Sequence, residues 1–203
     1  MPFGLHKYME QECKYFTIIR EPVKRLISQY NYISRQKINP NHHLVAEKSM
    51  SIQQMTESGL VKGFDNAQCR FLTNRFDVPF NELPEDTLDL ALSNLEKYFI
   101  FSGLTEKFDL SMLMLSKLLG WKKLPYYRRQ NTKKSKEKDY KVTDQDIASL
   151  RAQNQLDIQL YETAKQKFEK AVEEMPGVLE DLSEYQRKNS LYQKLTYPLS
   201  LFS

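Results

Sequence analysis

Arg20 lies at a predicted junction of a strand and a helix, where proteins commonly bind anions. Residues 15–30, YFTIIREPVKRLISQY, begin with a short apolar run, place Arg20 directly after it and continue with helical spacing. In open α/β sheets ligands bind at the carboxyl ends of the strands. The N-terminus of a following helix adds partial positive charge and free N–H groups. An arginine at such a junction favours an anionic ligand.

Ser28 lies on the polar side of the helix that follows. Pro22 suits the first helical position, because its missing N–H would be unpaired there. An apolar stripe is formed by Val23, Leu26, Ile27, Tyr30 and Ile33. Ser28 is about 9 Å along the helix from Pro22, so Arg20 and Ser28 could converge on one phosphate, with Lys24 or Arg25 adding charge. The alternative is that Arg20 is a strand-end arginine exposed to water and Ser28 an ordinary surface serine. Spacing alone favours this alternative.

The rest of the sequence predicts few strands and many helices. The two apolar runs with strand character are KYFTII at residues 14–19 and YFIF at residues 98–101, the second closed by Ser102-Gly103. Helical patterns fall near residues 49–58, 65–74, 83–95, 105–120, 143–147, 156–172 and after Pro176, with polar loops at 39–43 and 121–140. Two strands rarely form a stable sheet alone. We therefore expect a further strand to pair with them, and the sequence pattern does not contain it. The prediction is one partial α/β domain over residues 1–203.

Composition excludes several classes of protein. The chain of 203 residues is 40% hydrophobic with a formal net charge of +4, which permits an anionic partner without requiring one. It has two cysteines and no Asn-x-Ser/Thr sequon, as expected in a reducing compartment. No apolar run approaches the roughly 18 residues that span a bilayer. We therefore expect a soluble cytoplasmic chain; a membrane-associated or Golgi-luminal location would need an anchor in a longer parent chain.

The junction resembles a known signature. The string Arg20-Glu-Pro-Val-Lys-Arg-Leu-Ile-Ser28-Gln-Tyr30 is similar to the R-x-P-x-x-R-x-x-S-x-Y motif of the sulfotransferases, in the branch of the heparan sulfate 2-O-sulfotransferases and related bacterial carbohydrate enzymes. That resemblance implies a P-loop-like sulfotransferase fold with a small parallel sheet surrounded by helices. It also implies that Arg20 and Ser28 bind the 3′-phosphate of the donor PAPS (3′-phosphoadenylyl sulfate).

Further landmarks resemble the same family in order and spacing. YFIFSGLTE at residues 98–106 is similar to its strand and turn, and a basic loop and a helix beginning Thr-x-x-x-Ile at Thr143 follow. The resemblance implies that the loop folds over the cofactor, with Lys133 and Lys134 as phosphate ligands and Asn131 and Thr132 as further contributors. A solvated basic loop is the alternative for these residues.

Two parts of the family pattern are not found. The nineteen residues before Arg20 contain no Gly-rich or Lys-Ser/Thr loop of the kind that holds a 5′-phosphosulfate. The catalytic base is unknown; His6 is the histidine nearest the site, but only after a shift of register, and it also fits a packed histidine. His42 and His43 lack the spacing of a zinc site, so we expect no metal. The string D-N-x-Q-x-R at residues 65–70 fits either acceptor contacts or an N-cap at Asp65.

The sequence therefore predicts a sulfotransferase that transfers a sulfuryl group from PAPS to a carbohydrate hydroxyl. The alternative is a truncated, catalytically inactive module of the same family that binds a nucleotide or anion. A third interpretation, RNA binding by the aromatic and basic loop at residues 126–138, is less favoured and would require a steep salt dependence of affinity. Strand edges left unpaired would allow a homodimer.

Overall fold

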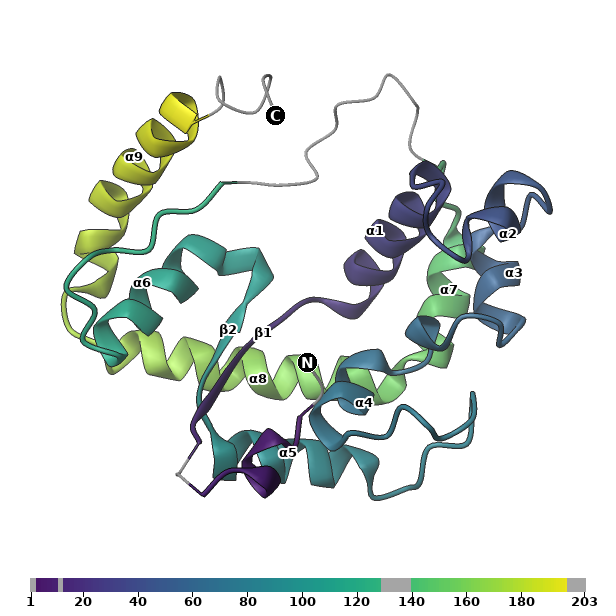
Figure 1. Ribbon diagram of the computed structural model, residues 1–203, viewed down its shortest axis with the longest axis horizontal. Helices are drawn as coiled ribbons and strands as arrows, with labels where there is room; N and C mark the ends of the chain where they lie inside the picture. The colour runs from purple at the N-terminus through teal and green to yellow at the C-terminus, as the bar shows by residue number, and fades with distance from the viewer. Residues whose placement is uncertain (1–2, 11–12, 129–139, 197–203) are drawn as a thin grey trace. The chain divides into compact units, whose positions relative to one another are not determined.

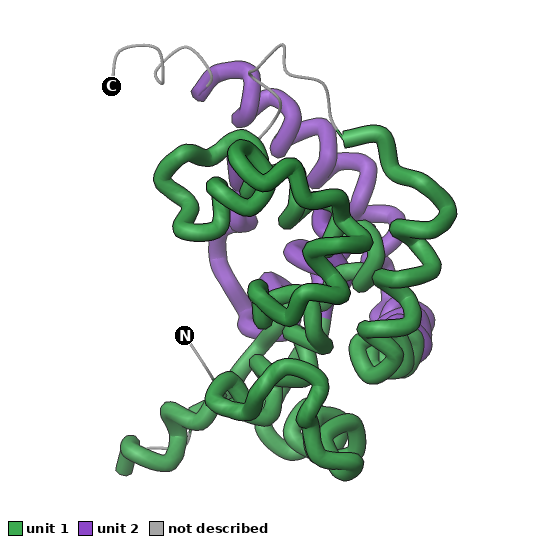
Figure 2. The backbone as a smooth tube through the Cα atoms, turned by 90° about the vertical axis from the view of Figure 1, so that its right-hand side faces the viewer, with its two compact units in different colours: residues 1–102, 139–164 green, residues 103–138, 165–203 purple. Residues whose placement is uncertain are grey.

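The chain folds into two compact units. The computed structural model describes residues 3–10, 13–128 and 140–196. Unit 1 comprises Met1–Ser102 and Asp139–Ala164, and unit 2 comprises Gly103–Lys138 and Lys165–Ser203, as coloured in Figure 2. The junction of Arg20 and the residues that surround it all belong to unit 1. The prediction of a single domain over residues 1–203 stays a prediction.

Unit 1 is mainly helical around a small sheet. Its elements are η1 (Leu5–Tyr8), β1 (Tyr15–Ile19), α1 (Pro22–Arg35), α2 (His42–Ala46), α3 (Ile52–Glu57), η2 (Lys62–Phe64), α4 (Ala67–Thr73), α5 (Thr87–Tyr98), the start of β2 (Phe99–Leu104), α7 (Asp144–Gln153) and the first half of α8 (Gln155–Glu173). The described residues form one sheet, in which β1 pairs with β2. The two strands run in the same direction (Figure 1). The predicted small parallel sheet among helices is confirmed.

The strand–turn–helix of β1 and α1 forms as the sequence predicts. β1 ends at Ile19, which is buried, and α1 begins at Pro22. The inward face of α1 carries the predicted apolar stripe, of which Val23, Leu26, Tyr30 and Ile33 are buried. These side chains belong to a core that also contains residues of α2, α3, η2 and α7, namely Leu44, Ile52, Met55, Val61, Phe64 and Leu150. Burial of this stripe holds the start of α1, and therefore Arg20, at the end of the strand.

The second strand is longer than its sequence pattern. Tyr98 ends α5, and the strand continues through Ser102 and Gly103 to Leu104. The prediction that Ser102-Gly103 closes it is wrong. The main chain of Leu104 is satisfied on both sides by Ser111, whose hydroxyl accepts the Leu104 N–H at 2.9 Å and donates to its carbonyl at 3.1 Å. β2 therefore ends three residues beyond the predicted strand, at a main chain that Ser111 bonds on both sides.

The described part of unit 2 contains three α-helical segments, a short 3-10 turn and a segment without regular structure. It contains η3 (Thr105–Lys107), α6 (Phe108–Leu118), the second half of α8 and α9 (Val178–Thr196). Lys117 of α6 pairs with Asp181 of α9 at 2.6 Å. The Tyr185 hydroxyl of α9 donates to the carbonyl of Pro125 at 2.8 Å, which fixes the described start of the predicted basic loop.

Several helix boundaries differ from the sequence prediction. The polar loop predicted over residues 39–43 ends in α2, because His42 and His43 each bond through Nδ1 to a main-chain carbonyl, of Ile33 and Pro40. The helical pattern predicted from residue 105 begins with the 3-10 turn η3 (Thr105–Lys107), and α6 starts at Phe108. On α6, Leu113, Met114 and Leu115 are buried, and Leu119, just beyond its end, is exposed. By contrast, the capping box at Thr143 and Asp146 forms with both of its bonds.

No helix in the described ranges combines the length and apolar character needed to cross a membrane.

Candidate functional site

Arg20 lies between β1 and α1 with its main chain fixed and its side chain available. Its N–H donates to Gln68 Oε1 and its carbonyl accepts from Gln68 Nε2, both at 2.9 Å. The residue is half-buried. Among the residues that the structure describes, the Arg20 guanidinium has no hydrogen-bond or ion-pair partner. A partly buried arginine with unused donors at the carboxyl end of a strand is suited to an anion.

The N-terminus of α1 differs from the prediction of free N–H groups. Glu21 is the N-cap, and its carboxylate accepts from the N–H of Val23 at 3.2 Å and of Lys24 at 2.7 Å. The negative charge stabilises the helix terminus. An anion at this junction would therefore meet the Arg20 side chain, while the first amides of the helix are already bonded.

Ser28 and Lys24 both lie on the exposed face of α1. Neither the Ser28 hydroxyl nor the Lys24 ammonium has a partner within the described ranges. Ser28 lies at the end of the second turn of the helix, about 9 Å along its axis from Pro22. The two groups are thus free to bind a ligand on the same face.

Arg25 points into unit 1 and away from that face. Its guanidinium donates to the carbonyl of Gly63 at 2.9 Å and lies 3.8 Å from the carboxylate of Asp157. Burial lowers the pKa of Arg25, Asp157 raises it and the charge of Arg20 lowers it again. Of the two predicted auxiliary cations, Arg25 ties α1 to η2 and α8, and Lys24 is the one left on the surface.

The chain beyond the basic loop returns to α1. The N–H of Tyr140 donates to Asn31 Oδ1 at 3.1 Å, and its ring packs edge-on against Tyr30 with 4.9 Å between centroids. Asn31 is three residues beyond Ser28, so Tyr140 is held about one helical turn from that serine. Lys133, Lys134, Asn131 and Thr132 lie outside the described residues, and their role stays a prediction.

Asp65, Asn66 and Arg70 of the D-N-x-Q-x-R segment belong to a buried polar network. Arg70 is fully buried, pairs with Asp65 and donates to the carbonyls of Arg75, Val78 and Pro79. Asn66, not Asp65, is the N-cap of α4. The predicted N-cap at Asp65 is therefore wrong, and acceptor contacts of this segment stay a prediction.

Asn66 and Asp157 join α4 to α8. Asn66 Oδ1 accepts from the N–H of Leu156 and of Asp157, which caps α8. The Asp157 carboxylate in turn accepts from the N–H of Gln68 at 3.1 Å and of Cys69 at 2.8 Å. Each helix thus supplies the cap of the other. Gln68 connects this network to the junction, because its side chain bonds to the main chain of Arg20.

His6 lies at the other end of the sheet from Arg20. Its Nδ1 is 3.0 Å from the Tyr15 hydroxyl, and its ring stacks on Tyr98 with 4.3 Å between centroids. Tyr15 begins β1, and five strand residues span about 17 Å, so the structure does not bring His6 and Arg20 together. The role of His6 as a base stays untested by this geometry.

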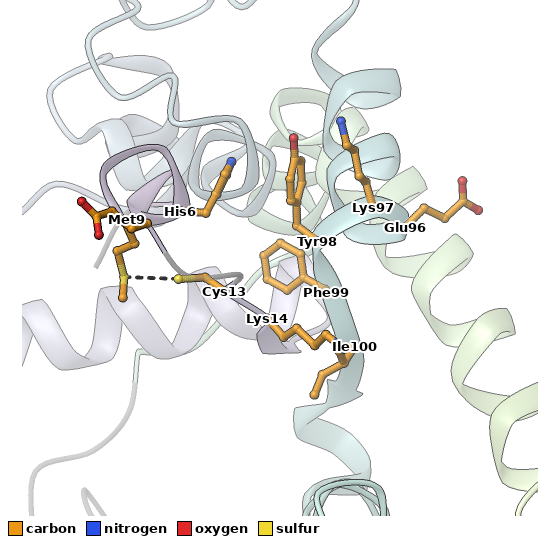
Figure 3. A pocket seen from close by; sticks show the side chains of 10 residues that line it. His6, Met9, Cys13, Lys14, Glu96, Lys97, Tyr98, Phe99 and Ile100 are labelled. Atoms are coloured by element: carbon orange, nitrogen blue, oxygen red, sulfur yellow. Dashed lines mark hydrogen bonds between the residues drawn. The ribbon is translucent and has the colours of Figure 1, made fainter.

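A cavity of about 540 Å³ lies beside His6. Figure 3 shows its lining, which includes Glu10, Lys14, Glu96, Tyr98 and Phe99. Lys14 precedes β1 and Phe99 begins β2, so the cavity is at the amino ends of the strands. It is separate from the junction that carries Arg20.

Sequence reasoning missed Gln68, Asp157 and Asn31. Gln68 belonged to the D-N-x-Q-x-R string, which was the available signal. No signal in the sequence pointed to Asp157, because a carboxylate near the start of a helix is usually explained by its favourable interaction with the helix dipole. Within the described ranges, no group of three His, Cys, Asp or Glu side chains gathers as metal ligands would.

Comparison with known proteins places these observations in a family. No curated protein matches the chain. The family model described as galactose-3-O-sulfotransferase matches residues 3–184, which include both strands and the Arg20 junction. This match confirms the prediction of a carbohydrate sulfotransferase family and does not confirm the heparan sulfate 2-O-sulfotransferase branch. The chain belongs to the galactose-3-O-sulfotransferase family.

Proposed function

We propose that this chain carries the 3′-phosphate half of a PAPS site in a carbohydrate sulfotransferase of P-loop-like fold. The observation that carries the proposal is the Arg20 guanidinium, half-buried at the carboxyl end of β1 and unpaired in the described part of the chain. A guanidinium can bind two phosphate oxygens at once. The Ser28 hydroxyl and the Lys24 ammonium supply further donors on the same side of α1.

The reaction is transfer of a sulfuryl group between two oxygens. The acceptor oxygen forms a bond to sulfur while the bond from sulfur to the 5′-phosphate oxygen of PAPS breaks. The proton of the acceptor hydroxyl goes to a base, and adenosine 3′,5′-bisphosphate leaves. In such transfers the protein contributes position and charge stabilisation. Arg20 and Ser28 hold the nucleotide and take no part in breaking bonds.

The family description supports a galactoside as the acceptor, sulfated on its 3-hydroxyl. This goes beyond a general carbohydrate acceptor. The heparan sulfate branch stays an alternative that acceptor competition can test. Methyl galactoside, its 3-deoxy analogue and a desulfated heparin should be compared with labelled PAPS; modification of the 3-deoxy analogue at an equal rate would contradict the 3-hydroxyl.

A second candidate is a nucleotide-binding module without turnover. It is favoured by the described residues ahead of Arg20, which form η1 and β1 and no phosphate loop. If this candidate is right, the chain alone binds the bisphosphate and transfers no sulfate. Labelled sulfate appearing on the galactoside in the presence of the chain would reject the module.

Calorimetry with adenosine 3′,5′-bisphosphate tests the proposed site. Arg20→Ala should remove about 1.5–3 kcal/mol of binding free energy, the range for a hydrogen bond to a charged group, and hence at least about tenfold in affinity. Ser28→Ala should lose less. Ser34→Ala, on the same helix with its hydroxyl bonded to the Asn31 carbonyl, is the matched control. Equal affinities of Arg20→Ala and the unmodified chain would overturn the proposal.

The basic loop adds a further proposal, that Lys133 and Lys134 reach the same phosphate. Its support is the family resemblance together with Tyr140, which is held one turn from Ser28. Lys134 precedes Tyr140 by six residues, a span of at most about 20 Å. Replacing both lysines by Gln should weaken bisphosphate binding and lower its salt dependence, whereas Lys122→Gln with Lys123→Gln should not.

A further inference from the structure

Gln68 bonds to both main-chain groups of Arg20. Its side-chain amide accepts from the Arg20 N–H and donates to the Arg20 carbonyl, at 2.9 Å in each case. This is the pairing that a neighbouring strand would provide. It falls one residue beyond the end of β1 at Ile19, so the amide fixes the backbone where the ladder has stopped.

Gln68 is itself held at a fixed place. It is the second residue of α4, and its N–H donates to Asp157 Oδ2 at 3.1 Å. The Asp157 side chain is fully buried and faces Arg25 at 3.8 Å. A continuous series of contacts therefore runs from α1 through Arg25, Asp157 and Gln68 back to Arg20. Each member is in unit 1.

We propose that Gln68 is a positioning residue, which sets the direction in which Arg20 presents its guanidinium to a phosphate. This deepens the proposed function and rests on it. With both main-chain groups of Arg20 bonded to one rigid amide, its backbone cannot turn without losing two hydrogen bonds. The guanidinium then needs less ordering when an anion binds, and preorganisation of this kind increases affinity.

The first test is affinity for adenosine 3′,5′-bisphosphate in Gln68→Ala. The expected loss is about three- to tenfold, in the range of coupling between neighbouring residues. Thr73→Val is the control, because Thr73 lies on the same helix and its hydroxyl bonds only to the carbonyl of Cys69. Both variants should be compared at temperatures well below their unfolding midpoints. Gln68→Ala binding as tightly as Thr73→Val would overturn the inference.

A double-mutant cycle separates positioning from general damage. If Gln68 acts through Arg20, Gln68→Ala should change affinity little in the Arg20→Ala background. An equal loss in both backgrounds would show that Gln68 does not act through Arg20. Arg20→Ala without effect would instead overturn the proposed function, and this inference with it.

Gln68→Glu keeps the inference testable if Gln68→Ala does not fold. The carboxylate still accepts from the Arg20 N–H but cannot donate to its carbonyl, and its charge pairs with the guanidinium. We expect a larger loss of bisphosphate affinity than in Gln68→Ala, reduced by protonation of the glutamate at lower pH. Unchanged affinity would overturn the positioning role.

Discussion

The carboxylate of Glu21 accepts the N–H of Lys24 at 2.7 Å, a donor that a bound anion would otherwise use. The same carboxylate bonds to the N–H of Val23. The residue next to Arg20 thus places a negative charge at the junction that we propose for a phosphate. Stability of α1 and affinity for an anion are opposed at this position.

We expect Glu21→Gln to bind adenosine 3′,5′-bisphosphate about two- to fivefold more tightly, because it removes a repulsive charge at a surface site. The amide can still cap α1. Calorimetry at two salt concentrations checks this, with the exposed Glu57→Gln as control. Weaker binding would show that the cap matters more than the charge.

Arg70 is the residue of unit 1 whose loss should cost most stability. Arg70→Leu removes the cation that pairs with the Asp65 carboxylate and the donors to four main-chain carbonyls. Breaking a buried pair in this way costs about 3–5 kcal/mol. Urea unfolding measures it, and Arg75→Ala, which breaks an exposed pair with Asp86, is the comparison expected to lose much less. Equal losses in the two variants would contradict the buried network.

Stability should fall in acid partly through Asp146. Burial raises the pKa of this carboxyl, but bonds from Thr143, Gln53 and Tyr140 lower it, and the pKa ends below its ordinary value. The folded protein therefore binds the proton less readily than the unfolded chain does. The stabilisation is present above the ordinary pKa and is lost as pH falls through the lowered one.

Asp146→Asn should flatten this dependence. Chemical unfolding at a series of pH values from about 6 to about 3 should give a smaller decline than in the unmodified chain. The exposed Asp144→Asn on the same helix serves as control. Parallel curves for Asp146→Asn and the unmodified chain would contradict the assignment.

His6→Ala should affect folding and not the nucleotide. The change removes the contact with the Tyr15 hydroxyl and the stacking on Tyr98, together about 1–3 kcal/mol of stability. Bisphosphate affinity should stay unchanged, because the ring lies at the amino end of β1. A loss of affinity as large as that of Arg20→Ala would contradict this placement.

The sequence predicted the strand, the turn and the helix around Arg20. It did not predict the distant residues that hold this junction in place. Pro22 and the apolar stripe of α1 are short-range signals, and both strands fell near their predicted places. The Gln68 bonds join residues 48 apart, and those of Asp157 reach 89 residues. The spacing of apolar residues along a chain does not reveal hydrogen bonds between residues so far apart in the sequence. Glu21 was missed for a different reason, because a glutamate is not among the preferred N-cap residues.

The mutual capping of α4 and α8 also sets an order of assembly. A ribosome makes the chain from the N-terminus, so β1, α1 and α4 are synthesised before Asp157 exists to bond Gln68 and Cys69. Closing a contact over that length carries an entropic cost that must be met late in folding. We expect the nascent chain to hold Arg20 in a loosely determined position until residues 139–164 have joined the first hundred.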